Sequence, residues 1–231
     1  MDNLYISVHI PKTAGESLKK FFIENVKQDQ LIFDYGKHNH TSNIISNNTH
    51  DLSKLKEIII SKYNKHKFLV VHGHFNFNKY FTIFPNAKYI TFFRNPLDLI
   101  PSLYFFLLRN QDKKNKLFQQ ISEGQMNIKQ FASLKNLSNF QTRFINHRKP
   151  QAFDFIGITD QFSDSVTKLG ELMELNIKSS KEIQVNKNTH KGAGYILSSN
   201  AIKIIKSNFN NDFNFYNEAK SLLINNTNKP I

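Results

Sequence analysis

The segment that most constrains the fold is residues 5–18, YISVHIPKTAGESL. An apolar run of β type is followed by a turn of proline and small residues, and then by a sequence that suits the start of a helix. Small residues let the backbone approach a ligand closely, and the N–H groups at a helix start have no partner within the helix. Lys12 adds a positive charge at the same place. The segment therefore predicts a site for a phosphate or sulfate group.

This turn differs from the loop of nucleotide-triphosphate enzymes, G-x-x-x-x-G-K-[ST]. The glycine pair is missing, and the lysine comes too early. A nucleotide kinase, one alternative class for a chain with a phosphate loop, is therefore disfavoured. An ordinary turn after a strand, with no ligand, is the other alternative for this segment alone.

A second informative segment is residues 88–104, KYITFFRNPLDLIPSLY. An apolar strand is predicted up to Arg94, Asn95 suits a helix N-cap, and Pro96 suits the first helical position. Arg94 then lies at the end of a strand, where open α/β sheets bind their ligands. Ser102 lies about two helical turns into the following helix. An arginine and a hydroxyl held in this way can bind one phosphate together.

Strands and helices alternate along the chain, which predicts an α/β fold with a mainly parallel sheet and helices on both faces. The expected strands span residues 4–10, 67–73, 89–93 and 153–158. The expected helices span residues 17–26, 51–62, 96 onward, parts of 112–147, 160–175, 197–208 and 211–225. Residues 27–53 are polar and are expected to form a long loop on the substrate side. The length of 231 residues fits one domain over residues 1–231.

The expected strand at residues 67–73 ends in His72, Gly73 and His74. Residues i and i+2 of an extended chain face the same side, so both imidazoles can point into one cleft. Histidine is the usual general base near neutral pH, and the glycine allows a substrate to approach closely. The alternative is a hydrogen-bonded pair of structural histidines.

Two of these motifs resemble a known family. HIPKTAGES at 9–17 resembles the 5′-phosphosulfate-binding loop of sulfotransferases that use 3′-phosphoadenosine 5′-phosphosulfate (PAPS), and FFRNPLDLIPSLY at 92–104 resembles their 3′-phosphate-binding strand and helix. The match is closest to the heparan-sulfate 2-O-sulfotransferase-like branch and related carbohydrate sulfotransferases. Further similar segments occur in the family's order: VVHGHF (70–75), NFQTRFI (139–145), FDFIGITDQFSDSVTKL (153–169) and NDFNFYNEAKSLL (211–223). The resemblance covers nearly the whole chain and implies one P-loop-like sulfotransferase domain.

The resemblance also implies residue roles. His74 is expected to be the catalytic base, with His72 supporting it or contacting the acceptor, and Lys12 is expected to stabilise charge on the bridging oxygen in the transition state. Arg94 and Ser102 are expected to hold the 3′-phosphate. The full set expected to bind PAPS is Lys12, Thr13, Ala14, Gly15, Glu16, Ser17, Arg94, Ser102, Lys191 and Gly192.

Some positions depart from the family pattern. Glu16 stands where the family usually has threonine or serine, and it would compete with the phosphosulfate if it pointed inward. Pro101 removes a backbone donor just before Ser102. Gln141 and Arg143 resemble positions near the acceptor, with a structural role on a helix as the alternative.

The net charge bears on the expected binding partners. The formal net charge of +13 predicts attraction to polyanions, although a coding bias toward Asn, Lys and Ile explains it equally well. A hydroxyl acceptor on a glycan is expected, with a tyrosine or a small-molecule hydroxyl as alternatives, and specific nucleic-acid binding is not expected. A basic polyanion-binding protein without catalysis remains a further alternative. The oligomeric state stays open.

Metal and membrane sites are not expected. The chain has no cysteine, and the histidines at 38, 40 and 50 have no acidic neighbour in a ligand spacing, so no metal is expected beside the PAPS co-substrate. No apolar run approaches the ~20 residues that span a bilayer. A cytoplasmic protein is therefore expected, with a catalytic domain cut from something longer as the alternative.

Overall fold

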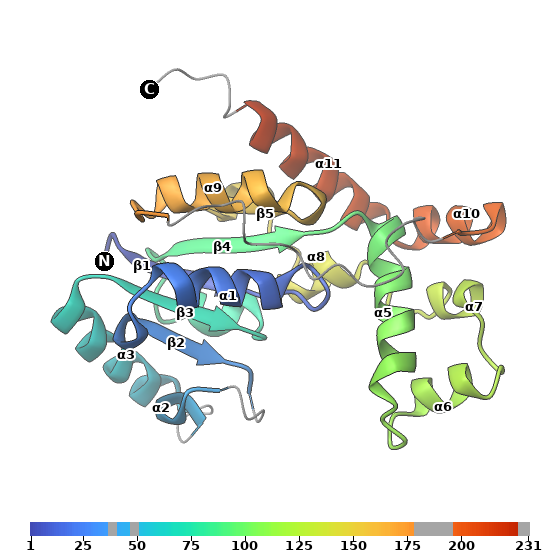
Figure 1. The fold of residues 1–231 in the computed structure, drawn as a ribbon, viewed down its shortest axis with the longest axis horizontal. Helices are drawn as coiled ribbons and strands as arrows, with labels where there is room; N and C mark the ends of the chain where they lie inside the picture. Colours follow the sequence, from blue (N-terminus) through green and yellow to red (C-terminus); the bar gives the residue numbers. More distant parts are fainter. Residues whose placement is uncertain (37–40, 47–50, 178–195, 226–231) are drawn as a thin grey trace.

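The computed structural model describes residues 1–36, 41–46, 51–177 and 196–225, and its centre is one sheet of five strands (Figure 1). The strands follow the order β2-β3-β1-β4-β5, and every neighbouring pair is parallel. They are β1 (Leu4–Val8), β2 (Leu31–Asp34), β3 (Leu69–Gly73), β4 (Lys88–Phe93) and β5 (Phe155–Ile158). The predicted α/β class with a mainly parallel sheet is confirmed.

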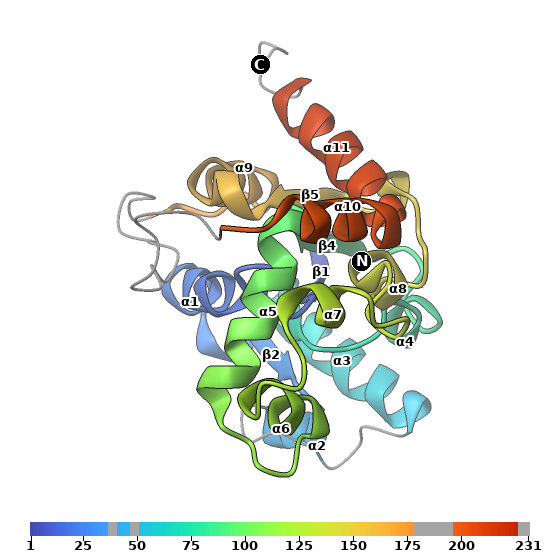
Figure 2. The ribbon, with the colours of Figure 1, turned by 90° about the vertical axis from the view of Figure 1, so that its right-hand side faces the viewer.

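Helices cover both faces of the sheet, as predicted (Figure 2). One face packs against α1 (Gly15–Asn25) and α9 (Phe162–Leu172), and the other against α3 (Leu52–His66), α4 (Phe77–Phe81) and α11 (Asn210–Asn225). A parallel sheet covered in this way needs apolar residues on both faces, and every residue of β1 and β3 is buried.

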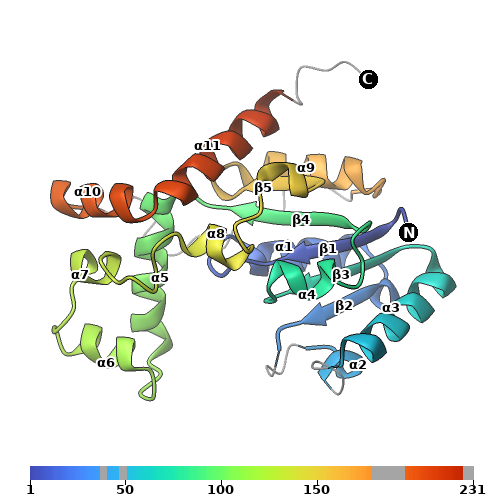
Figure 3. The same cartoon turned by 180° about the vertical axis from the view of Figure 1, so that it is seen from behind.

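A further group of helices lies beyond the carboxyl ends of the strands (Figures 1 and 3). It consists of α5 (Pro96–Asn110), α6 (Lys116–Ser122), α7 (Ile128–Ala132) and α10 (Ser199–Asn208). These helices share a core that includes Ile100, Phe131 and Phe209. The short α8 (Phe140–Phe144) and 3-10 turns at Pro150–Ala152 and Thr159–Gln161 complete the second half of the chain. The group stands next to the sheet edge where ligands of α/β proteins bind.

The start of α5 follows the prediction. The Asn95 side chain accepts a hydrogen bond from the N–H of Leu97 at 3.0 Å, and Pro96 occupies the first helical position. The helix then continues through Pro101. None of the described helices combines the length and the apolar character needed to cross a membrane.

The prediction of a long loop at residues 27–53 is wrong. The segment contains a 3-10 turn at Gln28–Gln30, the strand β2 and the short helix α2 (Asn43–Ser46). The run LIFD is only four residues long, and its strand conformation depends on pairing with β3, which lies far along the chain. Local polarity therefore concealed an edge strand.

Candidate functional site

Residues 9–14 connect β1 to α1 in a compact turn. The N–H and the hydroxyl of Thr13 both donate to the carbonyl of Ile10, at 3.3 and 2.8 Å. Lys12 and Ala14 adopt left-handed backbone conformations, with φ of 70° and 67°. Such conformations are costly for residues other than glycine and are often found at ligand-binding turns. The N–H of Thr13 is therefore engaged inside the turn.

The open donors lie one step later, at the start of α1. The first N–H of this helix that bonds to a preceding carbonyl is that of Leu18, to Ala14 at 3.0 Å. The N–H groups of Gly15, Glu16 and Ser17 have no hydrogen-bond partner among the described residues. The Glu16 side chain is exposed. The helix start therefore offers three N–H groups to an anion.

Positive side chains gather beside this helix start. Arg94, which follows β4, donates from Nη1 to the carbonyl of Lys12 at 3.2 Å. Burial lowers the pKa of Lys12, and the charges of Arg109 and Arg94 lower it further. The Nζ of Lys12 lies 4.3 Å from the ring centroid of Phe106. Cations that repel one another in this way are stabilised when an anion binds between them.

Helix α5 contributes more to this region than the sequence analysis found. Ser102, which is buried, shares a helix face with Phe106 and Arg109 by the i, i+4, i+7 spacing. The spacing was visible in the sequence, but nothing in it connected Phe106 and Arg109 with Lys12. The contact between the β1–α1 turn and α5 is tertiary.

The end of β4 is held by a buried amide. The side chain of Gln141 accepts from the N–H of Arg94 and donates to its carbonyl, both at 2.9 Å. The buried Asp212 carboxylate accepts from the N–H groups of Gln141 and Thr142, at 3.0 and 2.8 Å. Gln141 thus serves the structure and supports the backbone of Arg94, rather than contacting an acceptor. Arg143 donates to a backbone carbonyl at 2.8 Å, which is also a structural contact.

The two histidines of the HGH motif differ in exposure. His72 is completely buried, and its Nδ1 lies 2.9 Å from the Ser7 hydroxyl. His74 is partly exposed, and its Nδ1 lies 2.8 Å from the His9 carbonyl. A carbonyl only accepts, so Nδ1 of His74 carries the proton and Nε2 carries the lone pair. In this tautomer the basic nitrogen of His74 is Nε2, whereas His72 is buried beside Ser7.

A third histidine, His9, was missed by the sequence analysis. Its ring stacks on His74 with the centroids 4.1 Å apart and on His72 at 5.3 Å. The ring of Tyr35 stands edge-on to His74 at 5.0 Å. The register pairs Ser7 with His72, so that residues 7, 9, 72 and 74 share one face of the sheet. The sequence could have indicated the role of His9 only if β1 and β3 had been known to be neighbours.

The buried histidines are neutral. Burial, the charge of His74 and that of Lys19 lower the pKa of His72 to about 3. Burial, followed by the neighbouring His72 and His74, holds the pKa of His9 well below 6.5. Both rings are therefore uncharged at physiological pH.

This burial predicts that acid destabilises the protein. The unfolded chain binds protons at His9 and His72 near pH 6.5 and the folded chain does not, so their contribution is full above that pH and declines below it. For each pH unit of acidification below about 6.5, each histidine is expected to reduce the free energy of unfolding by up to about 1.4 kcal/mol. Urea unfolding between pH 7 and pH 5 measures the slope. We expect a shallower slope for His72→Asn and an unchanged one for the exposed His147→Asn; equal slopes in all three proteins would contradict the prediction.

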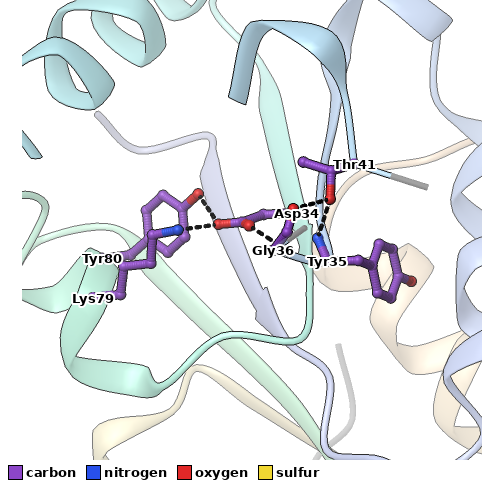
Figure 4. Close-up of polar contacts among 6 residues, drawn as sticks. All are labelled: Asp34, Tyr35, Gly36, Thr41, Lys79 and Tyr80. Carbon is purple, nitrogen blue, oxygen red and sulfur yellow. Dashed lines mark hydrogen bonds and ion pairs between the residues drawn. The ribbon is translucent and has the colours of Figure 1, made fainter. Parts of the chain in front are cut away.

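A buried ion pair fixes the end of β2 (Figure 4). The Asp34 carboxylate, 1% exposed, accepts from Lys79 Nζ at 2.6 Å and from the Tyr80 hydroxyl at 2.8 Å. Its other oxygen accepts from the N–H of Gly36 at 3.2 Å. Lys79 and Tyr80 belong to α4, which begins shortly after His74. The pair therefore connects the segment that follows His74 to the end of β2.

The same loop places Tyr35 (Figure 4). The N–H of Tyr35 donates to the Thr41 hydroxyl at 3.0 Å, and that hydroxyl donates to the Gly36 carbonyl at 2.8 Å. Tyr35 is held in this way against the stacked histidines. Asp34 thus supports the histidine cluster from two directions.

Some expected residues cannot be placed. Lys191 and Gly192, together with the histidines at 38, 40 and 50, lie outside the described residues. Across the described ranges, no three His, Asp or Glu side chains are arranged to hold a metal ion.

Comparison with known proteins supports the fold. No protein-family model matches the chain, and no curated protein matches it. A sulfotransferase from Alicyclobacillus acidocaldarius has a similar structure, with a TM-score of 0.52 and 10% identity over 97% of this chain and 96% of that one. The mouse sulfotransferase SULT7A1 complexed with PAP gives a TM-score of 0.47 and 14% identity over 99% of this chain and 86% of that one. At such identities the first likeness shows that this chain has the sulfotransferase fold.

Proposed function

We propose that this protein transfers a sulfuryl group from PAPS to an acceptor hydroxyl. The observation that carries the proposal is the juxtaposition of an anion site with a neutral base. The helix start at Gly15 and the cations Lys12 and Arg94 form the anion site at the carboxyl ends of β1 and β4. His74, with its lone pair on Nε2, stands at the end of β3. The sulfotransferase fold supports this reading.

The residues present fit the co-substrate. A phosphosulfate and a 3′-phosphate need donors and positive charge, and the N–H groups of Gly15, Glu16 and Ser17 supply donors with no competing acceptor. Lys12 and Arg94 supply charge, with Arg109 near Lys12. The exposed Glu16 side chain does not need to enter the site. Ser102, Lys191 and Gly192 remain proposed contacts to the 3′-phosphate side.

The proposed reaction is an in-line displacement. PAPS supplies the sulfuryl group: a bond forms between the acceptor oxygen and sulfur, the bond from sulfur to the phosphate oxygen breaks, and 3′,5′-adenosine bisphosphate leaves. Nε2 of His74 takes the proton of the acceptor hydroxyl. Lys12 stabilises the negative charge that develops on the phosphate side. His72 and Ser7 hold the strand end beneath His74.

Selective binding of the product nucleotide tests the site. Calorimetry should show tighter binding of 3′,5′-adenosine bisphosphate than of 5′-AMP or ATP. Arg94→Ala is expected to weaken bisphosphate binding by about 10- to 100-fold, since a charge-assisted hydrogen bond contributes about 1.5–3 kcal/mol. The exposed Arg143→Ala serves as a matched control with unchanged affinity. Equal affinity for the bisphosphate and 5′-AMP would argue against the proposal.

The acceptor proposed is a hydroxyl on a glycan. The formal charge of +13 favours an acidic polysaccharide, and the VVHGHF motif resembles the carbohydrate branch. Incubation with PAPS and desulfated heparin, a tyrosine peptide or a simple phenol, followed by detection of the sulfated product, distinguishes the acceptor classes. The charge also favours a second candidate, a polyanion-binding protein without catalysis. Salt-sensitive heparin binding with no turnover on any acceptor would support it.

A further inference from the structure

The backbone of His9 forms hydrogen bonds with Gly73, the last residue of β3, and with His74, which follows it. Its N–H donates to the Gly73 carbonyl at 2.9 Å, and its own carbonyl accepts from Nδ1 of His74 at 2.8 Å. The first bond extends the β1–β3 pairing by one step beyond β1. The second determines the tautomer of His74, because a carbonyl only accepts a hydrogen bond.

The ring of His9 fills the space between the anion site and the proposed base. It is stacked on His74, with an interplanar angle of 25°. On the other edge it lies against the start of α1: a Cβ added to Gly15 would lie only 1.5 Å from Nε2 of His9. Gly15 is therefore needed to make room for this ring. The ring contacts both halves of the proposed site.

A histidine is a costly choice for this position. The ring is 6% exposed, and its Nδ1 is buried without a hydrogen-bond partner among the described residues. Leaving a buried polar atom unpaired costs about 1–3 kcal/mol, and a purely apolar side chain would avoid that cost. Packing alone therefore does not explain a histidine between two others.

The surroundings of His9 keep it uncharged. The groups that face it are His72 and His74 from β3 and its end, Lys12 from the turn, Lys19 from α1, and the ring of Tyr35. All the titratable neighbours with charge are basic, and burial acts in the same direction. Of the three stacked rings, the partly exposed His74 is the one placed to receive a proton. The imidazolium then lies flat against a neutral aromatic ring, an arrangement that stabilises a cation.

We propose that His9 is a positioning residue for His74: its carbonyl selects the tautomer with the lone pair on Nε2, and its neutral ring orients His74 and stabilises the imidazolium formed during the reaction. The catalytic part of this inference rests on the proposed function. The physical part concerns His74 alone and is measured without any substrate.

The test follows the imidazole of His74 by ¹⁵N and ¹³C NMR across pH in three proteins. His9→Phe keeps a stacked ring, His9→Leu removes it, and both keep the backbone carbonyl. We expect Nδ1 to carry the proton in the neutral form of His74 in all three. We expect the pKa of His74 to fall by about half a unit or more in His9→Leu, and to stay close to the wild-type value in His9→Phe. An unchanged His74 titration in His9→Leu would overturn the proposal.

Two further readouts make the test robust. In the wild-type protein, the pKa of His9 should lie well below 6.5. A normal titration of His9, or a proton on Nε2 of neutral His74, would overturn the proposal even if a variant fails to fold. Release of 3′,5′-adenosine bisphosphate from PAPS, with desulfated heparin as the probe acceptor, is expected to fall about tenfold in kcat for His9→Leu with KM for PAPS unchanged, and less for His9→Phe. A larger KM with an unchanged kcat would point to a structural role only. Failure of the wild type to bind the bisphosphate would refute the proposed function and leave the NMR result standing.

Discussion

Replacement of His74 by alanine is expected to slow sulfuryl transfer by about 10²- to 10⁴-fold, the usual contribution of a general base. The proton of the acceptor hydroxyl then has no side chain to receive it, since His72 and His9 are buried and neutral. Binding of 3′,5′-adenosine bisphosphate should stay unchanged, because the anion site is formed by the turn after β1 and by Arg94. Product formation from PAPS on the acceptor panel, together with calorimetry on the same variant, measures both quantities.

The control for this experiment is the exposed His147→Ala, which should retain the wild-type rate. A pH–rate profile adds a second criterion: the wild-type rate should fall as His74 becomes protonated at acid pH, and the alanine variant should lose that limb. If His74→Ala turns over at the wild-type rate, the general base is another group. The hydrogen bond from Nδ1 of His74 to the His9 carbonyl then serves only the structure. If the variant loses both binding and turnover, the histidine cluster supports the anion site as well.

Replacement of Lys79 by methionine is expected to lower the free energy of unfolding by about 3–5 kcal/mol, the range for breaking a buried ion pair from one side. The Asp34 side chain is 1% exposed and that of Lys79 is 19% exposed, so removal of the ammonium leaves a buried carboxylate without its counter-charge. The Tyr80 hydroxyl and the Gly36 N–H would remain as donors, which favours the lower end of the range. Urea unfolding near pH 7 gives the difference directly.

A surface pair provides the matched control. Lys20 and Glu24 lie 3.5 Å apart with side chains 61% and 44% exposed, and Lys20→Met should change stability by less than about 1 kcal/mol. The double variant Asp34→Asn/Lys79→Met should recover part of the loss, because it also removes the buried charge. A loss below about 1 kcal/mol in Lys79→Met would show that the ion pair does not hold the loop beside Tyr35.

Local patterns were enough to predict the elements that build the site. The cap at Asn95 with Pro96 predicted the start of α5 to the residue, because a side-chain acceptor followed by proline acts within one helical turn. The alternation of apolar strands with helices predicted the parallel sheet, whose strands must be apolar on both faces. Arg94, Lys12 and His74 lie at strand ends because the motifs themselves follow apolar runs.

The sequence by itself thus determined the class of the fold, the turn before α1 and the strand-end positions of the proposed site residues. Each of these features depends on neighbours only a few residues away along the chain. Only the tertiary structure decided that β2 exists at the sheet edge, that His9 stacks on His74, and that Gln141 supports Arg94. The histidine pair is 65 residues apart and the amide contact 47. Such contacts depend on strand order and on which helix returns to which strand end. Hydrophobic periodicity carries no information about partners so distant, because it records which face of an element is buried and not what covers it.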